Sequence, residues 1–223
     1  MTTEHSPPQD AQFTQTPLTR VRRTAKRADY SHAAVYEALD HTYVCHVAFS
    51  VDGQPHCIPT AHWRIGDTLY IHGSNGSRMM RALAEGAPVS IAVTIVDGLV
   101  LARSVFHHSM NYRSAMVYGQ FHPVTDGQEK ELAMRAFLDK IETNRWGPAR
   151  PPNSKEYAAT TILAIKIEEA VAKTRTGPPI DDVEDMSQPV WAGVLPIETH
   201  MGMPIRDLSH EQADAQTSQK ETA

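Results

Sequence analysis

Apolar and polar residues alternate along much of the first half of the chain. Between residues 43 and 51 every second position is apolar or aromatic, which is the period of a strand with one buried face. Asp52-Gly53 follows, and this dipeptide favours a two-residue hairpin turn because glycine accepts a positive φ angle. The pattern then predicts a return strand over 54–65 and a third strand over 68–72. We therefore expect an antiparallel meander of three strands.

Three segments have the apolar spacing of helices. The first, over 31–39, begins at Ser31, whose hydroxyl suits an N-cap. The second runs from 77 to 85 and ends before Gly86, since glycine commonly follows the last helical residue. The third is a long helix that Thr125 or Asp126 can cap.

The remaining apolar runs predict strands. Val89–Val96 and Leu99–Phe106 are expected to be two buried strands joined by a second Asp-Gly turn, and 115–124 and 160–171 predict two more. Six or more antiparallel strands with few helices indicate a barrel, because closing a sheet removes its exposed edges. We therefore predict a mainly β fold, a β-barrel with α-helices.

Composition and charge narrow the classes of function. The hydrophobic content of 41% and the charged content of 21% are ordinary for a globular protein. A net charge of -5 gives no reason to expect a nucleic-acid partner, and the basic run over 20–27 is interpreted as solvated chain. The polar residues 1–20 and 201–223 predict a disordered N-terminal tail and a flexible C-terminal tail around a domain over 21–200.

The expected cellular location follows from features that the sequence lacks. Arg103 interrupts the longest apolar stretch, 87–106, so no membrane span is expected. The N-terminus lacks the apolar region of a signal peptide, and Cys45 and Cys57 have neither metal-type spacing nor a disulfide framework. We expect a cytoplasmic protein without a bound metal ion.

The strongest local signal lies over 70–78, where a strand leads into a small-residue loop and a helix. Gly73 and Gly76 let the backbone approach a ligand closely, and the helix start presents unpaired N–H groups. Ser74 and Ser77 offer hydroxyl donors, while Arg78 can bind a phosphate through two N–H groups. The segment fits either a phosphate site or a capped helix start with a glycine turn.

Two other polar segments have two interpretations each. The insert over 107–114 ends in Asn111, Tyr112, Arg113 and Ser114, which suit a phosphate or the edge of a heterocycle, or a polar loop at a subunit contact. The strand over 58–64 carries Pro59, which indicates an edge or a bulge, so its amides could face a ring system. The alternative is a kinked edge strand packed by Trp63.

Motifs of other enzyme classes are missing from the sequence. There is no Gly-x-Gly-x-x-Gly in a βαβ unit, no Gly-Lys-Ser phosphate loop and no Gly-x-Ser-x-Gly elbow. Although the chain has 12 histidines, none forms an i, i+4 pair within a convincing helix.

Taken together, these segments resemble the pyridoxamine 5'-phosphate oxidase-like superfamily of FMN-binding split barrels. The similarity spans roughly residues 20 to 197 and is nearest to the flavin-nucleotide-binding branch, which is related to the nitroimidazole-resistance reductases. The residues that carry it are Asp52–Pro55, Ile58–Thr60, Tyr70–Ser74, Ser77-Arg78, Val93-Thr94, Asp97–Ser104, His107–Ser114, Lys173–Pro178 and Val190–Gly193.

The resemblance implies a six-stranded antiparallel split barrel that forms a homodimer with FMN at the interface. It places flavin-binding residues on the strand over 59–63, in the loop over 72–78, which we call the phosphate loop, on the polar segment over 111–114 and on the tail. These residues are Pro59, Thr60, Ala61, His62, Trp63, His72, Gly73, Ser74, Ser77, Arg78, Thr94, Asn111, Tyr112, Arg113, Ser114 and Trp191. Some of them would serve the second subunit's flavin, and Trp191 would cover the ring from the tail.

One departure from the family concerns its substrate. The tail over 191–197 lacks the arginine- and histidine-containing stretch with which the true oxidases bind their substrate, so vitamin B6 oxidation is not expected. The resulting hypothesis is an FMN-dependent oxidoreductase that passes electrons between NAD(P)H and a small molecule. His62, His72 or His108 could donate a proton, and no catalytic residue is assigned. The alternatives are a flavin-binding protein without turnover and a haem-binding member of the same fold.

Overall fold

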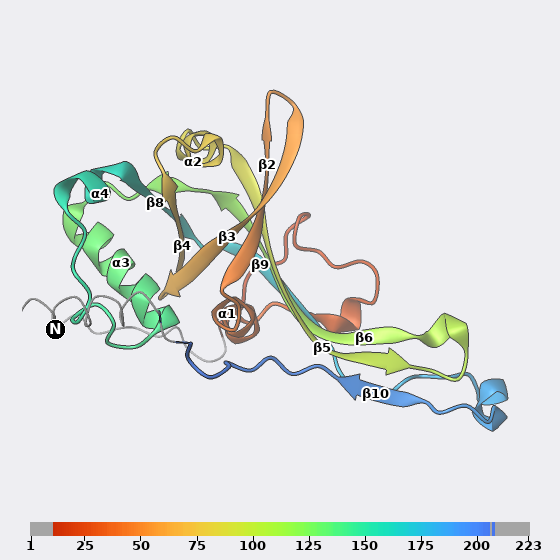
Figure 1. Cartoon of the computed structure of the whole chain (residues 1–223). Coiled ribbons are helices and arrows are strands. Elements are labelled where there is room, and N and C mark those ends of the chain that lie inside the picture. The colour runs from red at the N-terminus through yellow and green to blue at the C-terminus, as the bar shows by residue number, and fades with distance from the viewer. Residues whose placement is uncertain (1–10, 206, 208–223) are drawn as a thin grey trace, which may run out of the picture.

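The structure of the protein, a computed structural model, describes residues 11–205 and Asp207. One antiparallel sheet of ten strands organises it, in the order β1-β9-β6-β5-β2-β3-β4-β8-β7, with β10 pairing β5 (Figure 1). The predicted mainly β class is confirmed, with ten strands where six were expected. The strands are β1 (Ala28–Asp29), β2 (Val44–Val51), β3 (Gln54–Ile65), β4 (Thr68–Ser74), β5 (Pro88–Leu101), β6 (Ser109–Gln120), β7 (His122–Pro123), β8 (Thr160–Lys166), β9 (Glu169–Arg175) and β10 (Gly193–Pro196).

The three predicted helices are confirmed, and each begins at a residue that caps it. The Ser31 hydroxyl accepts the N–H of Ala34, and the Asp126 carboxylate accepts two N–H groups of the first turn. Gly86 follows the second helix with a φ of +85°, which glycine adopts without strain. The α-helices are α1 (His32–Asp40), α2 (Arg78–Ala84), α3 (Gly127–Ile141) and α4 (Ser154–Ala159), and the 3₁₀ turns are η1 (Ala25–Arg27), η2 (Val105–His107) and η3 (Val183–Ser187).

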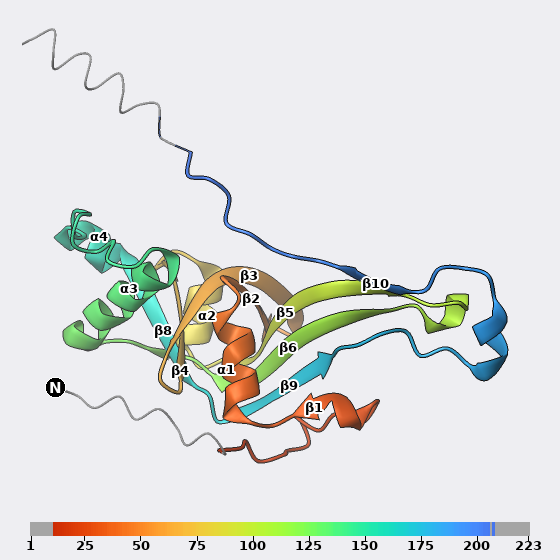
Figure 2. The same cartoon turned by 90° about the horizontal axis from the view of Figure 1, so that it is seen from below.

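The molecule consists of a barrel-like body and a long arm (Figures 1 and 2). The arm is the outer part of the β5–β6 hairpin, with β10 beside β5 and η2 at its tip. The main core lies between the sheet and the helices α1 and α2, where Val35, Leu83 and Ile91 are fully buried. A second, smaller core under α3 centres on Trp63.

Strand β3 changes its partner along its length, and this opens the barrel. Residues 54–61 pair with β2, whereas residues 62–65 pair with β4. The other edge of β3 over 54–61 has no strand partner among the described residues. The edge position predicted from Pro59 is thus confirmed, but the β2–β3 register runs without a shift, so no bulge is present. We call the opening between this free edge and the end of β4 the split.

Three of the predictions about strand boundaries are wrong. Asp97 and Gly98 do not form a turn: β5 continues through them, with a register shift between Val96 and Gly98 opposite β6. The predicted polar insert is mostly strand, since β6 already begins at Ser109, and the chain reverses within 102–108. The predicted strand over 160–171 is likewise two strands, β8 and β9, separated at 167–168.

Residues 11–20 were assigned to the N-terminal tail, yet they pack on the domain. Phe13 is 6% exposed and stacks on the ring of His32, with 4.0 Å between the ring centroids. Residues 1–10, 206 and 208–223 lie outside the described residues, and they hold half of the predicted N-terminal tail and most of the C-terminal one. No helix in the described ranges is long and apolar enough to cross a membrane.

Candidate functional site

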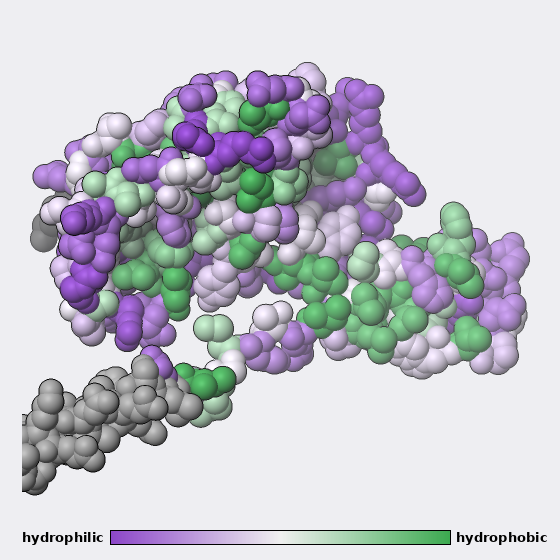
Figure 3. All heavy atoms as spheres, turned by 45° about the horizontal axis from the view of Figure 1, so that its top comes forward, coloured by the Kyte–Doolittle hydropathy of each residue, from purple (hydrophilic) through white to green (hydrophobic). Residues whose placement is uncertain are grey.

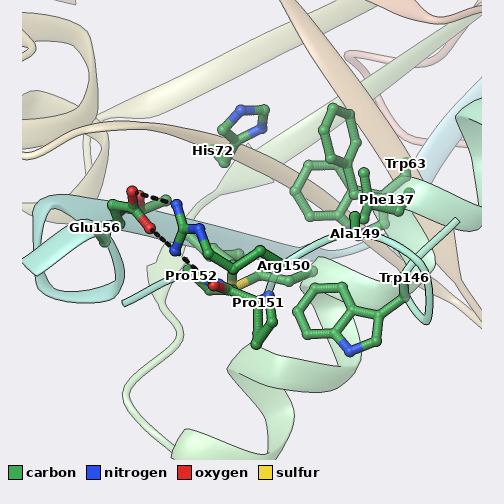
Figure 4. A pocket seen from close by; sticks show the side chains of 13 residues that line it. Trp63, His72, Phe137, Trp146, Ala149, Arg150, Pro151, Pro152 and Glu156 are labelled. Carbon is green, nitrogen blue, oxygen red and sulfur yellow. Dashed lines mark hydrogen bonds and ion pairs between the residues drawn. The ribbon is translucent and has the colours of Figure 1, made fainter. Parts of the chain in front are cut away.

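An aromatic pocket lies between the sheet, helix α3 and the loop that follows it (Figure 4). Its volume is about 370 Å³, within the range of small-molecule sites. Most of its wall is apolar. The residues that line it are Trp63, His72, Met134, Phe137, Leu138, Trp146, Ala149, Arg150, Pro151, Pro152, Glu156, Thr160 and Ile162. We call this cavity the aromatic pocket.

The wall of the aromatic pocket is built from neighbouring strands and one helix face. Trp63 on β3 and His72 on β4 lie side by side, with 5.7 Å between their ring centroids. Phe137 of α3 packs on both rings, at 4.9 Å from Trp63 and 4.7 Å from His72. Trp146 is held from the other side by the guanidinium of Arg135, 4.7 Å above its ring. The rings thus form an ordered hydrophobic surface.

His72 stands out in this wall because one of its two ring nitrogens is unsatisfied. Its Nδ1 is buried without a hydrogen-bond partner among the described residues, and so is the Nε1 of Trp63 beside it. Burial lowers the pKa of His72, so the imidazole is neutral at physiological pH. Buried polar atoms without partners are rare in native proteins. Neutral imidazole is the form in which histidine can donate a nitrogen lone pair to a ligand.

An ion pair lies at one end of the aromatic pocket. Arg150 donates through Nη1 and Nη2 to the two carboxylate oxygens of Glu156, at 3.0 and 2.8 Å. Glu156 also accepts the backbone N–H of Asn153, at 2.8 Å, and completes the capping box that begins α4. The pair therefore occupies the polar side of a pocket whose other walls are apolar (Figure 4).

Several predicted flavin residues lie on the two sides of the split. Pro59, Thr60 and Ala61 belong to the free edge of β3, and Gly73 and Ser74 belong to the end of β4, which has diverged from it. Because His62 pairs with Ile71, the register would place these two groups opposite one another if the strands had stayed paired. These predicted residues therefore border the split from its two sides.

The phosphate loop has a structural task as well. The Ser77 hydroxyl accepts the N–H of Met80 and caps α2, and the Ser74 hydroxyl accepts the N–H of Gly76. Both hydroxyl hydrogens remain free to donate to a ligand. Arg78 is exposed and forms no ion pair with any described residue. Capping and phosphate binding, the two interpretations of this loop, are compatible.

The other predicted residues do not join the aromatic pocket. His62 is 1% exposed, and its Nε2 donates to the carbonyl oxygen of Leu39 at 2.9 Å, which makes it a packing residue at the end of α1. Thr94 and Arg113 line a separate groove of about 970 Å³ beside Tyr43. Trp191 is 64% exposed on the arm.

Within the segment over 111–114, most polar groups already have partners. Asn111 is 8% exposed, and its Nδ2 donates to the carbonyl oxygen of Gly177 at 3.1 Å. The Ser114 hydroxyl donates to the carbonyl oxygen of Lys173, and Arg113 pairs with Asp97 and Glu37. These contacts hold the segment within its own chain, and they test neither the ligand site nor the subunit contact that the sequence suggested.

Sequence reasoning missed the half of the aromatic pocket that comes from residues 134–156. Phe137 belongs to the predicted long helix, but neither it nor Trp146, Arg150 and Glu156 was singled out as a site residue. The available signal was the combination of a tryptophan, an arginine and three prolines within 146–152, because such a loop after a helix has no obvious core position.

Comparisons with known proteins show the family of the chain. The family model described as pyridoxamine 5'-phosphate oxidase matches residues 31–174. The solved flavocytochrome Anf3 from Azotobacter vinelandii is 38% identical, with a TM-score of 0.82, covering 86% of this chain and 90% of that one. The FAD and haem binding protein from Mycobacterium smegmatis is also 38% identical, with a TM-score of 0.78, covering 82% and 89%.

A more distant structure shares the fold alone. A putative 5-nitroimidazole antibiotic resistance protein from Bacteroides thetaiotaomicron is 18% identical, with a TM-score of 0.56, covering 66% of this chain and 85% of that one. Curated proteins provide no match to the sequence.

Proposed function

We propose that this chain, which belongs to the pyridoxamine 5'-phosphate oxidase family, binds a flavin and a haem and passes electrons between them. The family fixes the split barrel, and two solved structures 38% identical to the chain are a flavocytochrome and a protein that binds FAD and haem. The observation that carries the proposal is His72, a neutral imidazole in the wall of the aromatic pocket whose Nδ1 has no hydrogen-bond partner among the described residues.

The aromatic pocket suits haem in three respects. Haem iron in proteins takes an axial nitrogen from neutral imidazole, which is the form that burial imposes on His72. Trp63 and Phe137 offer ring faces to a flat macrocycle. Arg150 offers a permanent positive charge where the wall becomes polar. The sequence predicted haem only as an alternative to flavin, whereas we propose that the chain binds both, the haem in the aromatic pocket and the flavin elsewhere.

The flavin is assigned to the split. The free edge of β3 presents backbone amides and carbonyls that can hydrogen bond to the edge of an isoalloxazine ring. Ser74, Ser77 and Arg78 offer donors for phosphate across the opening. The sequence analysis predicted FMN. We propose FAD, because the 38% identical protein from Mycobacterium smegmatis is an FAD protein.

The residues of the chain have defined tasks in this scheme. A flavin accepts two electrons and passes them on singly, and a haem accepts them one at a time. His72 lies on β4, and the end of the same strand borders the split. One strand therefore carries the proposed haem ligand and part of the proposed flavin site. Trp63 and Phe137 keep water away from the imidazole. NADH or NADPH is the electron donor that we propose, and the small-molecule acceptor is unassigned.

We propose that the protein acts as a homodimer. Large apolar side chains on the arm are exposed, and Figure 3 shows hydrophobic patches along the arm among more polar ones. Such patches usually mark an interface. The exposed residues are Leu99, Val105, Phe106, Met110, Trp191 and Leu195. Light scattering of the purified protein should give twice the chain mass, and a monomer would refute this part of the proposal.

Absorbance spectroscopy tests the proposed cofactors directly. Haem added to the protein should give a sharp, red-shifted Soret band, which His72→Ala should lose while His122→Ala, an exposed histidine on β7, should keep it. An unchanged Soret band in His72→Ala would refute the assignment. Flavin released by heat and separated by chromatography distinguishes FAD from FMN. Anaerobic bleaching by NADH or NADPH tests the electron donor.

A further inference from the structure

We propose that Arg150 is the carboxylate-binding residue of the aromatic pocket and that Glu156 is its built-in competitor. The inference rests on the proposed function, because it specifies the chemistry of the planar ligand: a tetrapyrrole that carries acidic side chains. Such a ligand would place its ring against the aromatic walls and its carboxylates on Arg150.

The charge distribution in the aromatic pocket supports this orientation. Among the described residues that line it, Arg150 carries the one permanent positive charge, since His72 is neutral. The remaining wall offers aromatic, aliphatic and proline surface. A planar ligand with acidic groups at one edge therefore has one favourable orientation, because a carboxylate buried against the apolar wall would lose its hydration without a partner.

The geometry of the ion pair shows that Arg150 is already set for a carboxylate. Its two Nη atoms meet the two oxygens of Glu156 in a side-by-side arrangement, which is the preferred geometry for recognising this group. The side chain of Arg150 is 66% exposed, so its remaining N–H groups are accessible to a ligand that enters the pocket. Glu156 thus stands where a ligand's carboxylate would bind.

Glu156 is the more fixed member of the pair. Its carboxylate accepts the N–H of Asn153 within the capping box, so its position follows from the start of α4. Arg150 belongs to the loop before α4, and its other side-chain contact is the neighbouring carbonyl oxygen of Pro151. The arginine can therefore turn from Glu156 to a ligand while the helix keeps its cap. Glu156 lowers the affinity for the acidic ligand by holding part of the charge of Arg150.

Substitutions can separate charge from structure at this site. Glu156→Gln removes the negative charge and keeps the capping hydrogen bond, because glutamine serves in the same motif. Arg150→Gln removes the positive charge. Arg145→Gln is the matched control, since Arg145 is an exposed arginine of the same loop that does not line the pocket.

The experiment uses iron-free protoporphyrin IX and its dimethyl ester as probes, with quenching of tryptophan fluorescence as the readout. Iron-free probes make the result independent of ligation by His72. We expect Arg150→Gln to bind the diacid about tenfold more weakly and Glu156→Gln to bind it about threefold more tightly. Neither variant should change the affinity for the ester, and Arg145→Gln should behave as the unmodified protein with both probes.

Each other outcome overturns the inference. Equal losses on the diacid and the ester would show that Arg150 only shapes the pocket. No change in Arg150→Gln would show that the acids lie elsewhere, and failure of both porphyrins to quench would show that the pocket does not take a tetrapyrrole. The haem titration of His72→Ala reports on the proposed function separately, so ligation can succeed while the carboxylate contact fails.

Discussion

Asp97 and Arg113 form a two-pronged ion pair across the β5–β6 ladder, beside the register shift of β5. Arg113 donates through Nη2 and Nε to the two oxygens of Asp97, at 2.9 and 3.2 Å, and through Nη1 to Glu37 on α1. The pair therefore ties the base of the arm to the body. Arg113 was predicted to bind flavin, but its guanidinium is already paired with these two carboxylates.

Asp97→Asn should lower the free energy of unfolding by about 1 kcal/mol, because a partly buried pair with good geometry loses its charge. Urea denaturation followed by circular dichroism measures the change. The control is Glu131→Gln, which removes an exposed pair within helix α3 and should cost about 0.3 kcal/mol. Equal costs in the two variants would show that the Asp97–Arg113 contact adds nothing to a surface pair.

Acid should destabilise the protein through His62. Burial lowers the pKa of this histidine to about 4, with Lys140 adding to the effect. Between that value and its ordinary pKa of about 6.5, the unfolded chain binds the proton and the folded chain does not. Stability contributed by the neutral form is therefore complete above pH 6.5 and falls as the pH drops towards 4, by an amount on the order of 3 kcal/mol.

His62→Gln isolates this effect, since glutamine can still donate to the carbonyl of Leu39. The free energies of unfolding of the two proteins, measured between pH 4 and pH 7, should converge as the pH falls. Parallel curves would show that His62 does not supply the acid sensitivity. His72 has its pKa lowered in the same direction and should add to the slope in both proteins.

The two cysteines should differ in reactivity. Cys45 is fully buried, and burial raises the pKa of its thiol to about 12, whereas Cys57 is exposed on the free edge of β3. A disulfide reagent at pH 8 should modify one thiol in the native protein and both in denaturant, because the thiolate is the nucleophile. Cys57→Ser should leave the native protein unreactive. Rapid modification of Cys45 in that variant would contradict the burial.

Ser77 and Arg78 should separate the structural and ligand-binding tasks of the phosphate loop. Ser77→Ala removes the N-cap of α2 and should cost about 1 kcal/mol of stability. Arg78→Gln should leave stability unchanged and weaken flavin binding about tenfold, because an exposed guanidinium without an ion pair serves no fold contact. Arg81→Gln, an exposed arginine on the next turn, is the control. Unchanged flavin affinity in Arg78→Gln would place the phosphate elsewhere.

The same dipeptide led to one right and one wrong prediction. At Asp52-Gly53 both residues have positive φ angles and form the expected hairpin turn. Gly98 has no positive φ, and a Cβ there would lie 2.9 Å from the carbonyl oxygen of Leu195 and the Cγ1 of Val194. That glycine admits β10 against β5. A contact with a strand about a hundred residues later leaves no signal in the local pattern.

The candidate site shows the same contrast between residues that local patterns predict and residues that only long-range packing brings together. Local patterns and the family resemblance predicted the two sides of the split, because those residues follow one another in short segments of strand and loop. The aromatic pocket joins Trp63 and His72 to Phe137 and Arg150, which lie far apart in the sequence. Their meeting depends on how α3 packs against β3, and periodicity does not contain that information.

The pairing of β4 with β8 also determines the order in which the strands can pair during synthesis. The hairpin of β5 and β6 can pair as soon as Gln120 has left the ribosome, since its strands are neighbours in sequence. The outer edge of β4 has to wait for Thr160–Lys166, and until then a growing chain exposes it to other nascent chains. The β5–β6 hairpin of the arm can thus form well before the pocket can close, whereas β10 joins it last. Variants that slow the emergence of β8 should aggregate during expression even when the finished protein is stable.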